Sequence, residues 1–129
     1  MSVPPYEAKA LSPILPVADL GVSTRFYGEV LGFSPLLESN DYVILRKGPA
    51  SLHLTKAAPG VMETVKGHMS IYLEVESILE LWTHVSQYKD KYRIRDFFER
   101  DYGMWEFHIC DPDGCLIFVG QAIPPADVS

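Results

Sequence analysis

Residues 103–120 read GMWEFHICDPDGCLIFVG, and this stretch decides the fold. Its centre, DPDG at 111–114, is a strong turn signal, because the proline restricts φ and the glycine accepts positive φ. The runs on either side are rich in aromatic and β-branched residues, which predicts a β-hairpin. On the first strand, apolar residues alternate with Glu106, His108 and Cys110. One face of the hairpin should therefore be apolar, while the other carries a carboxylate, an imidazole and a thiol.

Length and composition are those of one globular domain. The chain has 129 residues, 47% of them hydrophobic, and a net charge of -6. This charge makes nucleic acid and anionic membranes poor partners. No apolar run approaches the roughly 20 residues that cross a bilayer, and the N-terminus lacks the features of a signal peptide. We predict a cytoplasmic protein, in which Cys110 and Cys115 are small buried hydrophobic residues rather than a disulfide.

The same order of elements occurs twice along the chain. An extended run up to Val17 is followed by a helix at about 19–31, capped by Asp19 and ended by Gly32. Three strands follow, at about 33–38, 42–46 and 51–55. After a linker at 57–67 come a strand at 68–75, a helix with a capping-box pair at Ser77 and Glu80, a strand at 92–98 and the hairpin. We predict an α+β fold, a single domain over 1–129 with two βαβββ modules at about 11–56 and 68–120.

Each predicted strand has an apolar face that suits the protein core and an opposite face of mixed polarity. The more uniformly apolar faces should lie under the helices. The second helix should add Trp82 to the core. The expected core residues of the strands are Leu11, Leu15, Val17, Val43, Leu45, Leu52, Leu54, Met69, Ile71, Leu73, Val75, Trp105, Phe107, Ile109, Ile117 and Val119. The opposite faces mix aromatic surface with hydrogen-bonding groups, and three of the four histidines are among them. Such a mixture is typical of a small-molecule cavity, although a sheet face of mixed polarity can also be simply wet.

Four short sequence motifs are similar to motifs of a known protein superfamily. Val17-Ala18-Asp19-Leu20, Arg25-Phe26-Tyr27, Val30-Leu31-Gly32-Phe33 and Asp111-Pro112-Asp113-Gly114 resemble the vicinal oxygen chelate superfamily. Its members include glyoxalase I, extradiol dioxygenases, and the fosfomycin and bleomycin resistance proteins. The resemblance covers about 11–121. It implies two βαβββ modules whose mixed sheets curl into a cup, with helices on the outer face, usually completed in a homodimer.

The resemblance also implies where a metal would be bound. Metal-dependent members place His, Gln or Glu at fixed positions of the cup, and the corresponding residues here are Ser12, His53, Ser70 and Phe118. His68 lies two residues before Ser70 on the same face. A phenylalanine cannot bind a cation, and lone serine hydroxyls are poor ligands for divalent metals. We therefore expect the metal site to be dismantled and no cofactor to be bound.

Without a metal, the chain resembles the branch typified by bleomycin resistance protein, which sequesters its ligand without reaction. Pro13–Pro16, Asp41–Gly48 and Gly103–Gly114 are similar to the corresponding stretches of that protein, and Tyr102 lies where it has a groove-lining Trp. We predict a homodimer that binds an aromatic or cationic small molecule at or near its interface and catalyses no reaction. The expected ligand-binding residues are Tyr42, Arg46, His53, His68, Ser70, Tyr72, Tyr102, Glu106, His108 and Phe118.

Two alternatives stay open at this point. The first is a metal-dependent, glyoxalase-like lyase or dioxygenase with a rearranged site, for which His53, His68, Glu106 and His108 supply suitable ligand types. Glu106 and His108 could also serve as general acid and base, although no nucleophile or oxyanion-binding arrangement accompanies them. The second is an interaction module whose cup admits no ligand. Fold alone does not decide among these functions.

Overall fold

A computed structural model describes residues 2–125 of the chain. The first half contains β1 (Ile14–Val17), α1 (Leu20–Leu31), β2 (Ser34–Glu38), β3 (Tyr42–Lys47) and β4 (Ala50–Lys56). A short helix, α2 (Val61–Val65), lies within the predicted linker. The second half contains β5 (Ser70–Glu74), α3 (Ile78–Val85) followed by a 3-10 turn at Ser86–Tyr88, β6 (Ile94–Glu99), β7 (Met104–Cys110) and β8 (Leu116–Ala122).

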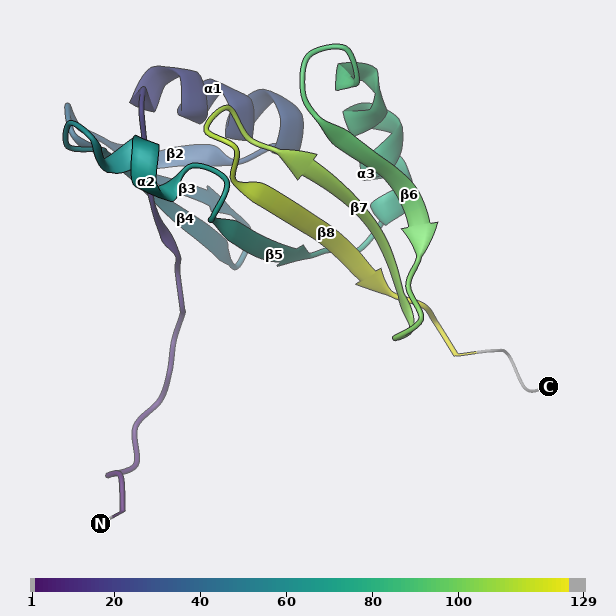
Figure 1. Cartoon of the computed structure of the whole chain (residues 1–129). Helices are drawn as coiled ribbons and strands as arrows, with labels where there is room; N and C mark the ends of the chain where they lie inside the picture. Colours follow the sequence, from purple (N-terminus) through teal and green to yellow (C-terminus); the bar gives the residue numbers. More distant parts are fainter. Residues whose placement is uncertain (1, 126–129) are drawn as a thin grey trace.

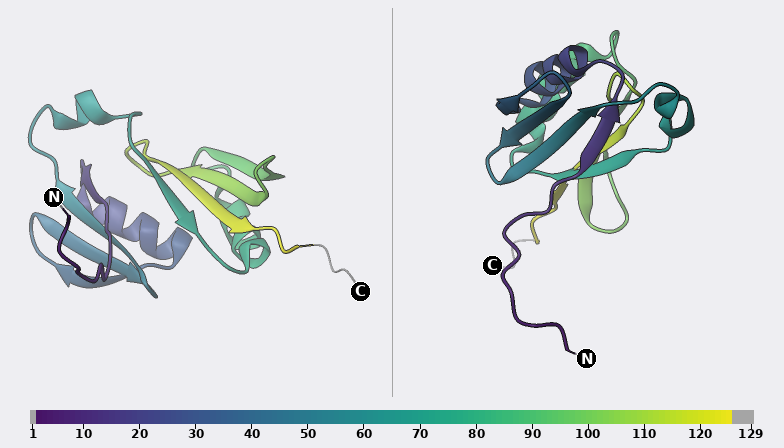
Figure 2. Two further views of the ribbon diagram at one scale, coloured as in Figure 1. Left: turned by 90° about the horizontal axis from the view of Figure 1, so that it is seen from below. Right: turned by 90° about the vertical axis from the view of Figure 1, so that its left-hand side faces the viewer.

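Each half forms a four-stranded mixed sheet, in the orders β1-β4-β3-β2 and β5-β8-β7-β6. In both sheets the first strand pairs in parallel with the last, and the remaining pairs are antiparallel. The helices α1 and α3 lie on the same side of the two sheets (Figure 1). Seen from below, the first sheet with α1 and the second sheet with α3 occupy opposite ends of the molecule (Figure 2). The predicted α+β fold of two βαβββ modules is confirmed.

The two long helices begin in different ways. The Asp19 carboxylate caps α1 as predicted, accepting from the Val22 backbone N–H at 3.0 Å. The capping box predicted for α3 is wrong: Ser77 precedes the helix but has a left-handed φ of 59° and makes no capping bond with its side chain. Instead, the Gln121 side-chain oxygen of β8 accepts from the Ile78 N–H at 2.9 Å. The side chain of a distant strand thus satisfies one of the free backbone donors at the start of α3.

The core lies between the helices and the sheets, as strand alternation predicts. Fifteen of the predicted strand residues are buried or pack against the core, including Val17, Leu54 and Phe107, each fully buried. Leu11 is the exception, because it precedes β1 and is 98% exposed. It belongs to the N-terminal arm, residues 2–13, which runs away from the sheets (Figure 1). Trp82 is partly buried and contacts Phe107, with ring centroids 5.2 Å apart.

The DPDG turn joins the two halves through a group that we call the turn cluster: Ser23, Tyr27, Asp111 and Asp113. The Tyr27 hydroxyl donates to Asp111 at 2.7 Å, and the Ser23 hydroxyl donates to Asp113 at 3.3 Å. Asp111 also accepts from the backbone N–H groups of Asp113 and Cys115, each at 2.9 Å. All four side chains are buried. The motif that decides the hairpin therefore also anchors the second half to α1 of the first.

Other sequence expectations can be placed on the described residues. Cys110 and Cys115 are free thiols; Cys115 is fully buried, whereas Cys110 is half-buried at the end of β7. Burial raises the pKa of the Cys115 thiol to about 12. None of the helices formed by residues 2–125 is long and apolar enough to span a membrane.

Candidate functional site on the second sheet

The face of the second sheet that turns away from α3 carries half of the predicted site residues. Because Phe107 packs against Trp82 of α3, strand alternation points its neighbours Glu106 and His108 to the opposite side. Phe118 of β8 pairs in register with both His108 and Tyr72, which brings β5, β7 and β8 together on this face. We call it the open face.

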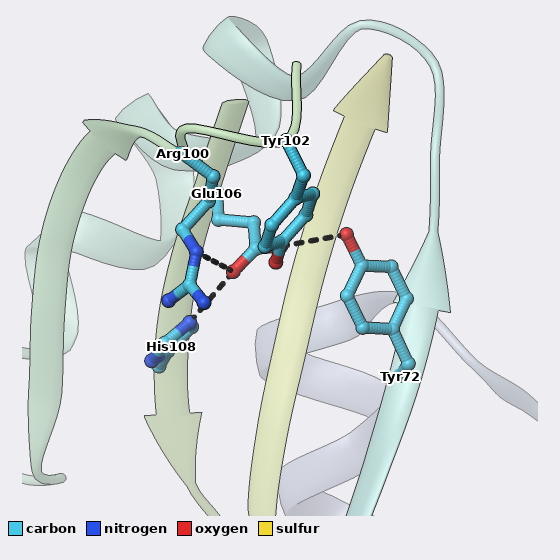
Figure 3. Close-up of polar contacts among 5 residues, drawn as sticks. All are labelled: Tyr72, Arg100, Tyr102, Glu106 and His108. Atoms are coloured by element: carbon cyan, nitrogen blue, oxygen red, sulfur yellow. Dashed lines mark hydrogen bonds and ion pairs between the residues drawn. The ribbon is translucent and has the colours of Figure 1, made fainter. Parts of the chain in front are cut away.

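Glu106 is the centre of a hydrogen-bonded group that we call the face cluster: Tyr72, Arg100, Tyr102, Glu106 and His108 (Figure 3). The Glu106 carboxylate is fully buried. Its Oε2 accepts from the Tyr72 hydroxyl at 2.8 Å and from the Tyr102 hydroxyl. Its Oε1 lies 2.9 Å from His108 Nε2 and 3.9 Å from Arg100 Nε. Four residues from three separate segments of the chain thus converge on one carboxylate.

These contacts keep the carboxylate ionised. Burial on its own would raise the pKa of Glu106, but hydrogen bonds from Tyr102, His108 and Tyr72 and the charge of Arg100 outweigh burial, so the pKa lies below its usual value. The same bonds act in the opposite direction on the tyrosines: desolvation and the Glu106 bond raise the pKa of Tyr72. Both hydroxyls are therefore neutral donors, and Glu106 is a negative acceptor.

Aromatic rings surround the face cluster. Phe118 lies against His108, with ring centroids 4.3 Å apart, and stacks nearly parallel to Tyr72 at 6.2 Å. Phe98 of β6 contacts the other side of His108 at 5.3 Å. The Tyr72 side chain is still 47% exposed and Tyr102 is 53% exposed. The open face therefore combines a buried anionic acceptor with accessible aromatic surface.

The first sheet carries a smaller polar group on its equivalent face. The Tyr42 hydroxyl and His53 Nδ1 lie 2.6 Å apart on adjacent strands, with their rings edge to face. Nearby, Ser51 of β4, the strand that also carries His53, shares a hydrogen bond with Ser12 of the N-terminal arm. Arg46 is exposed towards the end of β3. Among the described residues, no hydrogen bond or ion pair links these side chains to the face cluster.

The ten predicted residues therefore separate into groups. Five lie together on the open face: Tyr72, Tyr102, Glu106, His108 and Phe118. Tyr42 and His53 form a pair on the first sheet. Ser70 is exposed at the start of β5, and His68, expected in this strand, precedes it and is exposed too.

Sequence reasoning missed three contributors to the open face: Phe98, Arg100 and Gly120. Gly120 pairs with Glu106 across β7 and β8, and a Cβ atom built at Gly120 would lie 2.0 Å from the Tyr72 hydroxyl. An isolated glycine inside a strand is a sign of such close approach, so this residue could have been found. Phe98 and Arg100 come from a segment whose strand register is irregular, and alternation does not locate them.

The residues at the superfamily's metal positions do not fit a divalent metal. Ser12 is bonded to Ser51, His53 is bonded to Tyr42, and Phe118 offers no donor atom. Within residues 2–125, no three His, Cys, Asp or Glu side chains are grouped closely enough to bind a metal ion. The pair of Glu106 and His108 is one ligand short of such a group.

A cavity of about 150 Å³ lies between the two halves, beside the open face. It is bordered by Leu11 and Pro13 of the arm, Ser51 and Leu52 of β4, and Ile71 and Tyr72 of β5, among others. Pockets for drug-sized ligands are roughly 300–1,000 Å³. A drug-sized ligand would therefore not fit within this cavity alone. A larger hollow of about 620 Å³ lies elsewhere, lined by Pro49, Val75 and Leu81 among others, so cavity size by itself does not place a ligand on the open face.

Comparison with known proteins places this geometry in a family. Residues 9–119 match the model of the Glyoxalase/Bleomycin resistance protein/Dioxygenase superfamily. The chain belongs to this superfamily. The resemblance seen in the sequence is thereby confirmed. Members share the paired-module fold, so membership establishes the architecture and leaves the chemistry to the residues of each site.

Relatives within the superfamily are named bleomycin resistance protein. One, from Geobacillus stearothermophilus, is 26% identical over 125 residues, which cover 86% of this chain and 95% of the relative. One from Staphylococcus aureus gives the same values. Solved structures of similar fold include a bleomycin-binding protein complexed with bleomycin, with a TM-score of 0.74, 23% identity and coverage of 88% of this chain and 98% of that one. An antibiotic-binding protein from a Streptomyces species has a TM-score of 0.71 at 20% identity, covering 94% and 99% of the two chains. At these identities the structures show the fold alone.

Proposed function

We propose that this protein is a metal-free binding protein of the bleomycin-resistance type, which sequesters an aromatic or cationic small molecule on the open face. The observation that carries the proposal is the arrangement of half-exposed tyrosine rings around a buried, ionised carboxylate. Flat rings offer stacking surface, and the carboxylate supplies negative charge where water is largely excluded. The bleomycin resistance proteins among its relatives support an antibiotic as the ligand.

We infer that the site is completed by a second copy of the chain. On one copy the open face is uncovered, and the adjoining cavity of about 150 Å³ is too small for an antibiotic. A homodimer that places another sheet opposite the open face would convert it into a closed groove. The pair of Tyr42 and His53 on the first sheet would supply aromatic and polar surface for the opposite wall.

The proposed function is tested by titrating the protein with metal-free bleomycin in a calorimeter. We expect saturable binding, and we expect Tyr102→Ala to weaken it about threefold to tenfold, the loss typical of an aromatic contact. Leu79→Ala is the matched control, because Leu79 is 54% exposed, like Tyr102, but lies on α3. Absence of binding, or equal weakening by the two variants, would contradict the proposal.

Metal content of untagged protein tests the metal-free state. We expect far less than one divalent ion per chain, because the inherited ligand positions hold serine and phenylalanine. About one tightly bound ion per chain, lost in His108→Ala, would instead favour the metal-dependent lyase or dioxygenase. Sedimentation of the same sample reports whether the chain is a dimer.

A further inference from the structure

The face cluster fixes which nitrogen of His108 carries the proton. His108 Nε2 lies 2.9 Å from Glu106 Oε1, and Glu106 is a buried carboxylate that can only accept. Its other oxygen is occupied by two tyrosine hydroxyls. In its neutral form the imidazole must therefore hold its proton on Nε2, which leaves the lone pair on Nδ1.

Nδ1 is the ring nitrogen of His108 that the face cluster does not use. It makes no hydrogen bond with any of residues 2–125, yet these residues leave no buried side-chain nitrogen or oxygen without a partner. Nδ1 therefore keeps a small exposure to solvent, within a residue that is only 7% exposed in total. Arg95, which pairs with His108 across β6 and β7, stacks on the Phe98 ring at 3.8 Å and does not donate to Nδ1.

The ring is also held in place, so the accessible nitrogen has a fixed position. Phe118 and Phe98 contact His108, with centroid distances of 4.3 and 5.3 Å. Glu106 is in turn fixed by Tyr72, whose hydroxyl reaches it by crossing over Gly120. Any side chain at 120 would occupy that path, since even a Cβ would lie 2.0 Å from the hydroxyl oxygen. Gly120 is thus a positioning residue for the carboxylate that orients His108.

We propose that His108 Nδ1 is a hydrogen-bond acceptor that selects ligands carrying an N–H or O–H donor beside a flat ring. The inference rests on the proposed binding function and specifies the chemistry of the same site. Phe118 and Tyr72 offer the flat ring its stacking surface, and the donor reaches Nδ1 at the edge of that surface. A ligand of equal shape and charge but without the donor would leave Nδ1 desolvated and unpaired.

Two probes isolate the donor. They are 9-amino-10-methylacridinium and 9-(dimethylamino)-10-methylacridinium, which share a flat ring system and a positive charge, but only the first has N–H groups. We expect the full-length protein to bind the first about tenfold more tightly, the effect of one good hydrogen bond. Equal affinities would overturn the inference and leave the proposed function standing. Failure of both probes and of bleomycin to bind would overturn both.

Glu106→Gln tests whether the preference for the donor probe depends on the tautomer of His108 or only on the shape of the site. The two tyrosine donors should keep the amide oxygen at the position of Oε2, which places the amide NH₂ against His108 Nε2. The proton of His108 must then move to Nδ1, and the preference for the donor probe should disappear. Retention of the preference in a folded Glu106→Gln protein would contradict the inference.

Nitrogen-15 spectra of histidine-labelled natural protein test the tautomer directly. Four histidines contribute signals, and His108→Asn identifies the one in question. We expect the neutral Nε2–H form in the free protein and a shift of the Nδ1 signal when 9-amino-10-methylacridinium binds. A neutral Nδ1–H form in the free protein would overturn the proposal.

Discussion

The turn cluster and the face cluster are both buried carboxylates bonded by tyrosine, yet they differ in one respect. In the turn cluster the donor Tyr27 is fully buried, and the Asp111 and Asp113 carboxylates that it and Ser23 contact are buried too. In the face cluster Glu106 is fully buried, but its donors Tyr72 and Tyr102 are 47% and 53% exposed. The acids are buried in both clusters, but the exposure of their tyrosine partners differs.

This difference separates a structural contact from a candidate binding site. Donors of the turn cluster come from α1 and hold the second half against the first, so exchanging them for a ligand would open the molecule. Donors of the face cluster can move into solvent without disturbing the core. A buried acid with a tyrosine is therefore not by itself a sign of ligand binding, and the accessibility of its partners must be considered as well.

The largest effect is expected from Asp111→Ala in the turn cluster. The change leaves the Tyr27 hydroxyl and the N–H groups of Asp113 and Cys115 without their acceptor. Each buried donor left unpaired costs about 1–3 kcal/mol, so the free energy of unfolding should fall by about 3 kcal/mol or more. Urea unfolding measures it, with the exposed Asp90→Ala as control. If the free energy of unfolding fell no more than it does in Asp90→Ala, the turn cluster would not have this structural role.

Gly120→Ala should have an intermediate effect, confined to the face cluster. The new Cβ displaces the Tyr72 hydroxyl from Glu106, and the lost hydrogen bond to a charged group should destabilise the protein by roughly 1 kcal/mol. Bleomycin affinity should fall as well. Gly21→Ala is the matched control: its Cβ would meet Asp19 at 3.4 Å, and alanine favours a helix. Equal free energies of unfolding for Gly120→Ala and Gly21→Ala would contradict this account.

The two clusters should respond to pH with opposite signs. The pKa of Glu106 is lowered in the fold, so its contribution is present above the unfolded value of about 4.3 and is lost as the pH falls through the folded pKa. Burial raises the pKa of Asp111, although bonds from Tyr27 and the backbone partly oppose it. Its contribution is therefore present below the unfolded value of about 3.9 and is lost as the pH rises through the folded pKa.

Unfolding free energies measured across the acid range check these signs. The advantage of the natural protein over Glu106→Gln should shrink on acidification, whereas its advantage over Asp111→Asn should grow. If the advantage of the natural protein changed with pH in the same direction against both variants, the two acids would not have pKa shifts of opposite sign.

The smallest effect concerns the two thiols, which flank the DPDG turn. Cys115 is fully buried next to Asp111, and desolvation raises its pKa to about 12, so a thiol reagent should reach it only on unfolding. Cys110 is half-buried at the end of the open face and should react first, though slowly, because burial raises its pKa as well. Modification of Cys115 at the rate of Cys110 would show that the turn cluster opens readily.

Most of the fold follows from local patterns in the sequence. Strand alternation, the Asp19 cap and the DPDG turn are local signals, and the structure bears them out. The failures involve long-range contacts. Gln121 caps α3 in place of the predicted box, and Leu11 continues an apolar run but lies beyond the end of β1. Neither result can be derived from residues that are near in sequence.

Four of the five side chains of the face cluster were predicted, Arg100 being the exception, but most of the bonds between them were not. Alternation on one strand placed Glu106 and His108 on the same face, and their pairing follows directly. The burial of Glu106 and the convergence of Tyr72, Tyr102 and Arg100 depend on strand order and on the β6–β7 loop. Register between strands far apart in the chain, rather than residue type, decides which donors reach the acid.

The parallel pairing of first and last strands in each half bears on synthesis as well as on structure. β1 cannot find its neighbour until β4 has been made, and β5 must wait for β8. Contacts between residues so distant in sequence form slowly. The first sheet can be completed once β4 has left the ribosome, but the second can close only after β8 has emerged as well. Until then the aromatic strands β5 and β7 are unpaired with β8, and this nascent intermediate is the stage at which the protein is most exposed to aggregation and most dependent on chaperones.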